Sequence, residues 1–314
     1  MPTFEILCLA NSKKHGGRCV AGLRTDGGGW VRPVADSEDG ALFPEHYTLP
    51  DGSEPRILDV LRISPRECRP KPHQPENWCM TRAHWDLVSR PAPGAAVSLL
   101  QSSLERGPAL FGSLADRVPF DSILRSPAPA SLALVAPQDL KWWIACNPAT
   151  GKSQARARFR LDGALYNLVL TDPICLARLM SLPPGIYPAT SAGFKPDERF
   201  LLTVSLGEPF EGNCFKLAAG VVALPAAVYS QVVAARRDPA SPPAAVRTMR
   251  VRPEIRDPLL AEYEARRGSA LARRILEAFD AEWPRDGSED RAVQRMRQEI
   301  ESHFRERLNE ADSY

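Results

Sequence analysis

The chain has 314 residues, enough for about two folded units of ordinary size. Apolar residues make up 44% of the sequence and charged residues 25%, which excludes a wholly disordered or collagen-like chain. The 40 basic and 38 acidic residues nearly balance, so the net charge of +2 gives no global field that attracts nucleic acid. Any such partner must be bound by a local patch.

The N-terminal segment and the cysteines predict a cytoplasmic protein. Residues 1–7 show no basic stretch before an apolar core, so they read as a first strand and not as a signal peptide. No run of about 18 apolar residues occurs, which excludes a membrane-spanning helix. The seven cysteines are odd in number and scattered among apolar neighbours, a pattern typical of reduced thiols. We expect no cofactor.

The first 90 residues alternate between short apolar runs and turn residues. Strands are predicted at Glu5–Leu9, Arg18–Leu23, Trp30–Val34 and Ile57–Ile63. The cluster Asp26–Gly29 is a tight turn that joins two of them into a hairpin. Residues 91–130 are rich in Pro, Ala, Ser and Gly and read as a connection, with a helix predicted near residues 97–106.

A second strand-rich stretch follows the connection. Its predicted strands are Leu140–Cys146, Ala155–Leu161, Tyr166–Leu170, Phe200–Leu206 and Cys214–Val222. The segment 155–161 alternates strictly, so its arginines share the outer face of a half-buried strand. Asp162-Gly163 is a hairpin turn. About five short strands in each half predict a mainly β protein with two small barrels.

The composition changes beyond residue 230. Residues 238–257 form a linker rich in Pro, Ala and Arg, and two helical patterns follow it. The second carries a narrow apolar stripe: Val293, Met296, Ile300, Phe304 and Leu308. The predicted domains are therefore 1–125, 126–230 and a helical tail at 231–314, which we interpret as a segment that packs on the protein or docks a partner.

Two motifs contain residue types typical of phosphate or zinc binding, but their spacing or context does not fit. Residues 147–153 end in Gly-Lys-Ser, but Cys146 occupies the place of the first glycine of a phosphate loop, and a strand follows where a helix is needed. We therefore reject nucleoside triphosphate hydrolysis by this loop. Cys68, His73, Cys79 and His84 have ligand chemistry for zinc without the spacing of the common fingers, so no metal site is predicted.

The most specific segment is Asn11–Gly22, where basic side chains and the free amides of Gly16-Gly17 come just before a strand. Trp30 and Arg32 follow on the next strand. A basic loop beside an aromatic platform suits phosphates and stacked bases together. The alternative is a solvated basic loop with the tryptophan in the core. The arginine strand repeats the pattern beside Trp142, Trp143 and Tyr166.

Several separated stretches, in order along the chain, resemble the bacterial dual OB-containing domain. They are Lys14–Gly22, Gly29–Val34, His73–Trp78, Thr171–Pro173, Leu202–Phe210 and Phe215–Leu217. The resemblance covers about residues 3–223 and implies two tandem OB-like barrels that bind nucleic acid, often in bacterial genome defence or on mobile elements. It implies no catalytic residues and does not reach the tail.

The leading hypothesis is a nucleic-acid-binding protein, with single strands favoured. The predicted contacts are Lys13, Lys14, His15, Arg18, Trp30 and Arg32 in the first barrel and Lys152, Arg156, Arg158 and Arg160 in the second. Together they are expected to line one continuous trough. One alternative is an enzyme acting on a nucleotide or nucleic acid, with His15, Asp172 and Glu76 converging between the barrels. Another is an adaptor that recruits a nuclease or helicase through the tail.

Overall fold

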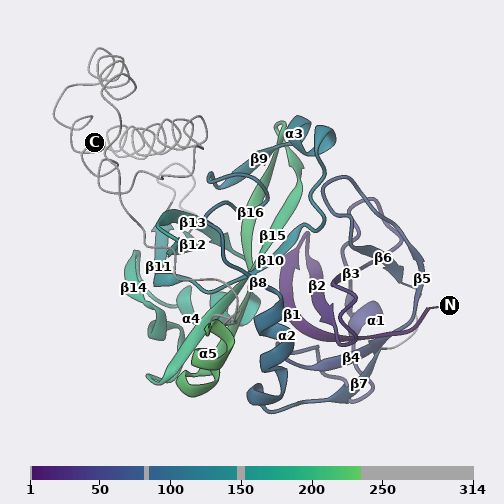
Figure 1. The fold of residues 1–314 in the computed structure, drawn as a ribbon, viewed down its shortest axis with the longest axis horizontal. Helices are drawn as coiled ribbons and strands as arrows, with labels where there is room; N and C mark the ends of the chain where they lie inside the picture. Colours follow the sequence, from purple (N-terminus) through teal and green to yellow (C-terminus); the bar gives the residue numbers. More distant parts are fainter. Residues whose placement is uncertain (1, 81–84, 147–152, 235–314) are drawn as a thin grey trace, which may run out of the picture. The chain divides into compact units, whose positions relative to one another are not determined.

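Two β-sheets hold most of the residues that the structure describes. The computed structural model describes residues 2–80, 85–146 and 153–234 (Figure 1). The linker and the two helices predicted after residue 238 lie outside these ranges, as do His84 and Lys152. The chain divides into a unit of residues 1–235 and a unit of residues 236–314, and both sheets belong to the first unit.

The first sheet is built from residues 4–89. Its strands are β1 (Phe4–Lys14), β2 (Gly17–Arg24), β3 (Trp30–Val34), β4 (Val60–Ile63), β5 (Pro65–Cys68), β6 (Asn77–Met80) and β7 (Asp86–Ser89). Their order in the sheet is β5-β6-β3-β2-β1-β4-β7. Neighbouring strands are antiparallel except β3 and β6, which run parallel. The short helix α1 (Pro44–Tyr47) lies between β3 and β4.

The second sheet is larger. Its strands are β8 (Leu104–Glu105), β10 (Leu132–Val135), β11 (Gln138–Cys146), β12 (Ser153–Leu161), β13 (Ala164–Leu170), β14 (Gly185–Pro188), β15 (Glu198–Phe210) and β16 (Asn213–Pro225). They are ordered β14-β11-β12-β13-β16-β15-β10-β8, and β9 (Arg117–Pro119) pairs separately with β16. The long hairpin β15–β16 extends upward in Figure 1.

Short helices fill the connections. The segment between the sheets carries the 3-10 turn η1 (Pro93–Ala96) with α2 (Val97–Ser102) and α3 (Phe120–Arg125). The second half carries α4 (Pro173–Leu179), the 3-10 turn η2 (Ala189–Ala192) and α5 (Ala226–Val233). The helix predicted near residues 97–106 ends at Ser102, because Leu104 and Glu105 form a strand beside β10. Within the described residues, no helix combines the length and apolarity needed to cross a membrane.

The two sheets repeat one connectivity. In the first, β1, β2 and β3 form a meander, β4 lies antiparallel beside β1, and β6 ends a hairpin parallel to β3. In the second, β11, β12 and β13 form the meander, β14 lies beside β11, and β16 ends a hairpin parallel to β13. The fold is therefore mainly β with two OB-like halves. In the hydrogen-bond order of the described strands, neither sheet closes into a complete barrel.

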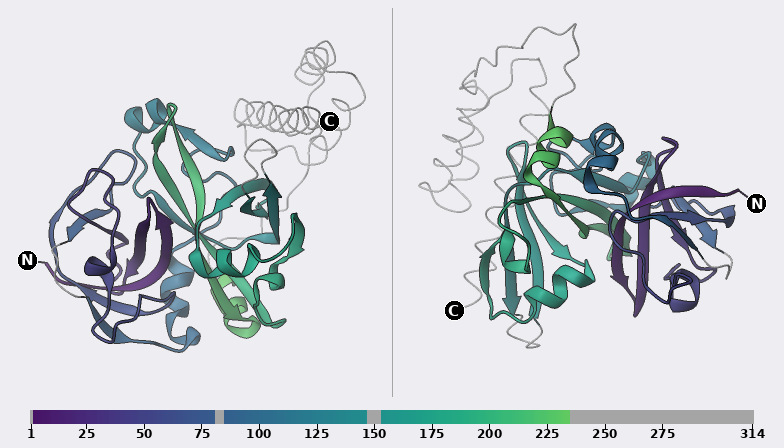
Figure 2. Two further views of the ribbon diagram at one scale, coloured as in Figure 1. Left: turned by 180° about the vertical axis from the view of Figure 1, so that it is seen from behind. Right: turned by 90° about the horizontal axis from the view of Figure 1, so that it is seen from below.

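The outer face of the first sheet is covered by the second sheet. One apolar cluster joins Leu7, Leu9 and Leu23 to residues 134, 201, 222 and 224 of the second half. The contact is close in the backbone as well, because the Thr203 hydroxyl donates to the Leu9 carbonyl at 2.6 Å. A Cβ built on Gly220 would lie 2.2 Å from the same carbonyl oxygen. Figure 2 shows β1 and β2 against the β15–β16 hairpin.

Candidate functional site

The arginines of β12 lie on one face of the second sheet, as their alternation predicts. Arg156 and Arg158 are partly exposed and Arg160 is exposed. The intervening side chains are buried in the core of this half: Ala155, Ala157 and Phe159. Since side chains point alternately to the two sides of a strand, the three arginines share the outer face.

Neighbouring strands add an aromatic ring and further polar groups to that face. Lys141 on β11 and Asn167 on β13 stand opposite Arg158, and Trp143 stands opposite Arg156. The Arg158 guanidinium carbon lies 5.6 Å from the centroid of the Trp143 ring. We name the following set the β12 face: Lys141, Trp143, Arg156, Arg158, Arg160 and Asn167. Lys141 and Asn167 were absent from the predicted contacts, although the period of two in β11 and β13 could have indicated them.

The three arginines differ in how many hydrogen bonds their guanidinium groups donate within the protein. Arg156 donates to the Asn167 side chain at 3.0 Å, to the Asn167 carbonyl at 2.7 Å and to Gln154 at 2.8 Å. Burial lowers the pKa of Arg156. Arg160 donates to the Gly163 carbonyl at 3.1 Å. Arg158 lies over the Trp143 ring, and its side chain makes no hydrogen bond or ion pair with another described residue. Of the three arginines, Arg158 is therefore the one whose guanidinium donors are least used within the protein.

The other aromatic side chains predicted near this strand are inside. Trp142 is fully buried, and its indole N–H donates to the Ala189 carbonyl at 2.8 Å. Tyr166 is also buried and stacks on Phe159 with ring centroids 5.4 Å apart. Trp143 is consequently the tryptophan that the strand alternation places on the outer face.

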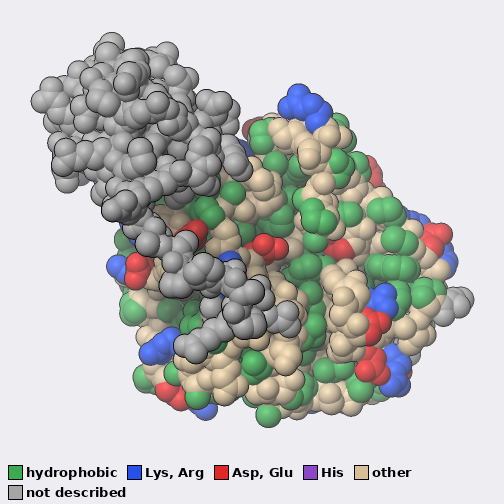
Figure 3. All heavy atoms as spheres, in the orientation of Figure 1, with side chains coloured by type: hydrophobic (Ala, Val, Ile, Leu, Met, Phe, Trp, Pro, Cys, Tyr) green, Lys and Arg blue, Asp and Glu red, His purple; other side chains and the backbone are tan. Residues whose placement is uncertain are grey.

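The cations of the β1–β2 hairpin are partly neutralised. Lys14 pairs with Glu208 at 2.9 Å, and Arg18 pairs with Glu54 at 3.0 Å. Lys13 is exposed, and so is His15, which occupies the hairpin turn with φ 45°. On the side drawn in Figure 3, many Lys and Arg side chains lie beside Asp or Glu, in agreement with the small net charge. This hairpin is therefore a weaker cationic surface than its sequence suggests.

Trp30 and Arg32 do not form a surface platform. Trp30 is partly buried and packs against the apolar clusters between the two sheets. Arg32 is 1% exposed, and its guanidinium lies 2.9 Å from Glu76 and donates to Ser131 at 2.7 Å and to Ser205 at 3.2 Å. Arg32 is buried and Trp30 is partly buried because the second sheet covers the outer face of β3. Arg32 joins the two halves from the inside.

The structure separates the two predicted sets of cations. In the second sheet β13 and β16 follow β12, and it is β16 that contacts β1. Two strands therefore stand between the arginine strand and the β1–β2 hairpin. One continuous trough that joins the two sets stays a prediction, and Lys152 lies outside the described residues.

The three side chains of the enzymatic alternative have other surroundings. Glu76 binds Arg32 and the Ser131 amide; burial raises its pKa, but these partners outweigh burial and hold it below the ordinary value. Asp172 caps α4 and accepts from three backbone amides, while burial raises its pKa. His15 is exposed at its turn. The observed contacts give no catalytic arrangement of these three groups.

The Cys/His series also has other partners. His73 lies 2.7 Å from Glu208, Cys79 is buried, and Cys68 is exposed. In the part of the chain that the structure describes, no group of three or more His, Cys, Asp or Glu side chains is arranged to hold a metal ion. His84 lies outside the described residues.

Glu208 makes the fold sensitive to acid. Burial raises its pKa, but hydrogen bonds from His73 and Lys14 and the nearby charge of Lys71 outweigh burial and lower the pKa to about 2. A carboxyl whose folded pKa is depressed stabilises the protein above its unfolded pKa of about 4.3 and loses that contribution as the pH falls toward 2. We expect Glu208→Gln to remove about 1–2 kcal/mol of stability at pH 7 and much less at pH 2.5, as measured by urea unfolding. An equal loss at both pH values would contradict this.

Comparisons with known proteins bear on both halves. A family model of the dual OB-containing domain matches residues 4–221. No curated protein matches the chain. Among solved structures, the chain is similar to a crystal structure of the tetrameric p202 HIN2, with 9% sequence identity and a TM-score of 0.26. That alignment covers 71% of this chain and 91% of the other. A TM-score this low carries no argument, whereas the family match spans both sheets.

Proposed function

Because the chain belongs to the family of dual OB-containing domains, we propose that it binds single-stranded nucleic acid on its β12 face. OB folds bind oligonucleotides on the face of their second and third strands and on the adjoining loops. In the second half, β12 and β13 are the second and third strands of the meander. The β12 face is thus the surface on which an OB fold binds a nucleic-acid strand.

The observation that carries the proposal is the pairing of Arg158 with Trp143. The guanidinium lies 5.6 Å from the ring centroid, and Lys141 is the cross-strand neighbour of Arg158. An unpaired base can stack on the indole while the flanking cations bind phosphates. A duplex hides its base faces, so stacking on Trp143 favours a single strand.

The first half supports the proposal because its equivalent surface is packed against the second sheet. Its second and third strands, β2 and β3, turn their outer face toward the second sheet, where Ala21 and Leu23 contribute to the shared apolar clusters. Arg32 on this face is paired with Glu76. The equivalent binding surface of the first half is thus used for packing, and we assign strand binding to the second half.

The test is a fluorescence anisotropy titration of the full chain with labelled dT15 and rU15. Trp143→Ala should weaken binding by about 5- to 100-fold, because stacking of one base contributes about 1–3 kcal/mol. Arg62→Gln is the matched control, since Arg62 is an exposed arginine on the first sheet, paired with Glu5. Circular dichroism of each variant verifies folding. Equal affinities for Trp143→Ala and the wild type would refute the β12 face as the binding surface.

The salt dependence supplies a second readout. If three phosphates are bound, the logarithm of the association constant should fall with the logarithm of salt with a slope of about −2, and Arg158→Gln should reduce that slope by about 0.7. A flat response between 50 and 200 mM salt would contradict binding through the backbone. The roles in genome defence and as an adaptor rest respectively on the family resemblance and on the tail, which lies outside the described residues.

A further inference from the structure

The outer face of the second sheet continues from β12 across β13 onto β16. Arg156 stands opposite Val169 on β13, and Val169 stands beside Leu217 on β16. Phe215 comes two residues before Leu217, so the two side chains point to the same side of β16. Lys216 between them is buried on the inner side. The β12 face therefore extends to Phe215.

Two rings and a guanidinium gather at this end of the face. Arg117 on β9 stands opposite Phe215, and its guanidinium carbon lies 4.6 Å from the centroid of that ring. The centroids of the Phe210 and Phe215 rings are 6.5 Å apart, and Phe210 is 62% exposed. Arg117 pairs with Asp116 at 2.8 Å, which neutralises its charge, so the contribution expected here is stacking. We name Phe210, Phe215 and Arg117 the hairpin platform.

The tip of the β15–β16 hairpin is an ordered turn. Phe210 pairs with Asn213, and the two residues between them, Glu211 and Gly212, have φ values of 48° and 74°, as in a tight two-residue turn. The Phe120 amide donates to the Gly212 carbonyl at 2.8 Å. The Phe210 ring is therefore presented by a backbone that needs little ordering when a ligand binds.

The first half holds this hairpin through Glu208, two residues before Phe210. The Glu208 carboxylate accepts from Lys14 at 2.9 Å, lies 2.7 Å from Nε2 of His73 and lies 3.6 Å from Lys71. All three partners belong to the first half, where Lys14 ends β1 and the other two lie between β5 and β6. The position of the hairpin platform is therefore set in part by the first half.

We propose that the nucleic-acid strand on the β12 face continues across β16 and stacks a second base on Phe210, whose position the first half fixes through Glu208. This inference rests on the proposed function, since it needs the strand on the β12 face. Trp143 on β11 and Phe215 on β16 are three strands apart, about 14 Å at the usual spacing. A single nucleotide cannot contact both rings, so the ligand is an oligonucleotide of several residues.

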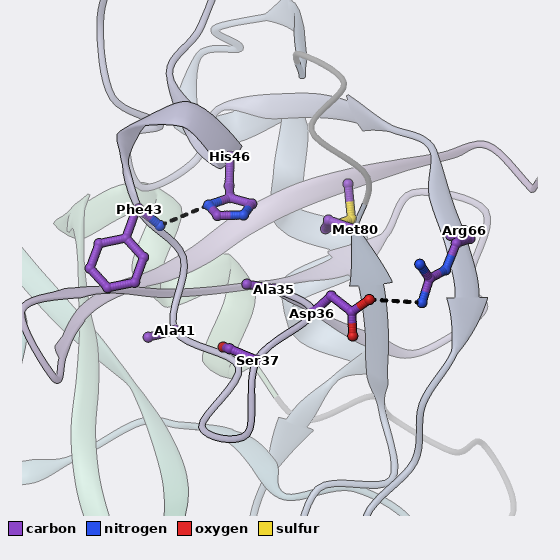
Figure 4. A pocket seen from close by; sticks show the side chains of 8 residues that line it. All are labelled: Ala35, Asp36, Ser37, Ala41, Phe43, His46, Arg66 and Met80. Atoms are coloured by element: carbon purple, nitrogen blue, oxygen red, sulfur yellow. Dashed lines mark hydrogen bonds and ion pairs between the residues drawn. The ribbon is translucent and has the colours of Figure 1, made fainter.

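The first test is a fluorescence anisotropy titration of the full chain with labelled dT15. Phe210→Ala should weaken binding by about 5- to 100-fold, because it removes one stacked base. The matched control is Phe43→Ala, which removes a 39% exposed ring from the pocket of the first half and should leave binding unchanged (Figure 4). In competition with labelled dT15, the advantage of unlabelled dT8 over dT2 should fall at least about fivefold in Phe210→Ala, since dT2 is too short to reach both rings.

Glu208→Gln tests the role of the first half as a positioning device. The substitution removes a negative charge, which by itself strengthens the binding of a polyanion. We expect weaker binding of dT15 instead, by about two- to tenfold, because the released hairpin must be ordered when the strand binds. In the Phe210→Ala background the same substitution should not weaken binding further. Circular dichroism verifies that each variant is folded under the conditions of the titration.

The outcomes separate this inference from the proposed function. If Trp143→Ala weakens binding and Phe210→Ala does not, the strand ends on the β12 face and only this inference fails. If Trp143→Ala has no effect, both fail. Unchanged or tighter binding by Glu208→Gln, or an equal loss in the wild-type and Phe210→Ala backgrounds, overturns the positioning of Phe210 by the first half.

Discussion

Arg32→Met should lower the free energy of unfolding by about 3–5 kcal/mol, because it leaves the Glu76 carboxylate buried without its cation. Both side chains are almost completely enclosed, with side-chain exposures of 2% and 4%. The Arg32 guanidinium also binds Ser131 and Ser205 of the second half, so the substitution weakens the junction between the sheets. Chemical denaturation followed by tryptophan fluorescence measures the loss.

The control is Arg62→Met, which breaks the exposed pair with Glu5. Its side chains are 48% and 38% exposed, so we expect a change within about 0.5 kcal/mol. The double variant Arg32→Met/Glu76→Gln should recover at least about 1 kcal/mol of the loss, since the uncompensated charge is gone. If Arg32→Met cost no more than Arg62→Met, the buried ion pair would not support the junction. Nucleic-acid binding by Arg32→Met is compared with the wild type only under conditions in which the variant is folded.

Gly220→Ala should lower the free energy of unfolding by about 2–3 kcal/mol, through overpacking between the sheets. The added Cβ would lie 2.2 Å from the Leu9 carbonyl oxygen, and both partners are backbone in paired strands. Neither strand can move alone, because Thr203 beside Gly220 donates to the same carbonyl. Denaturant unfolding of the variant tests the effect.

Gly207 on β15 provides the matched position. A Cβ there would lie 3.4 Å from the nearest atom, the Phe215 carbonyl oxygen, which is an ordinary contact. We expect Gly207→Ala to change stability by less than about 1 kcal/mol. Similar losses at both glycines would show that the approach of β16 to β1 is not the cause.

This close approach bears on function as well as on stability. Two halves with the same connectivity each offer an outer face of their second and third strands. Packing of β1 against β16 uses this face in the first half and leaves β12 and β13 for the second.

Local pattern was enough to predict much of the fold. The alternation at residues 155–161 predicted both the strand and the shared face of its arginines, because the period of two is a property of the strand itself. Asp162-Gly163 predicted its turn, and both residues have positive φ. The helix α4 was missed, although Asp172-Pro173 carries its N-cap signal: the Asp172 carboxylate accepts from the amides of Ile174 and Cys175.

The sequence by itself determined the longer strands, their turns, the family and the arginine face, since each depends on neighbouring residues or on motifs in order. The short strands β5 to β10 and β14 were not predicted. Only the tertiary structure decided which cations remain at the surface. Arg32 and Arg158 both belong to alternating strands, yet one pairs with Glu76 in the interior and the other lies beside Trp143 on the outer face. The difference comes from residues about 100 or more positions away that cover β3 and leave β12 uncovered by the described strands, and no local pattern carries that information.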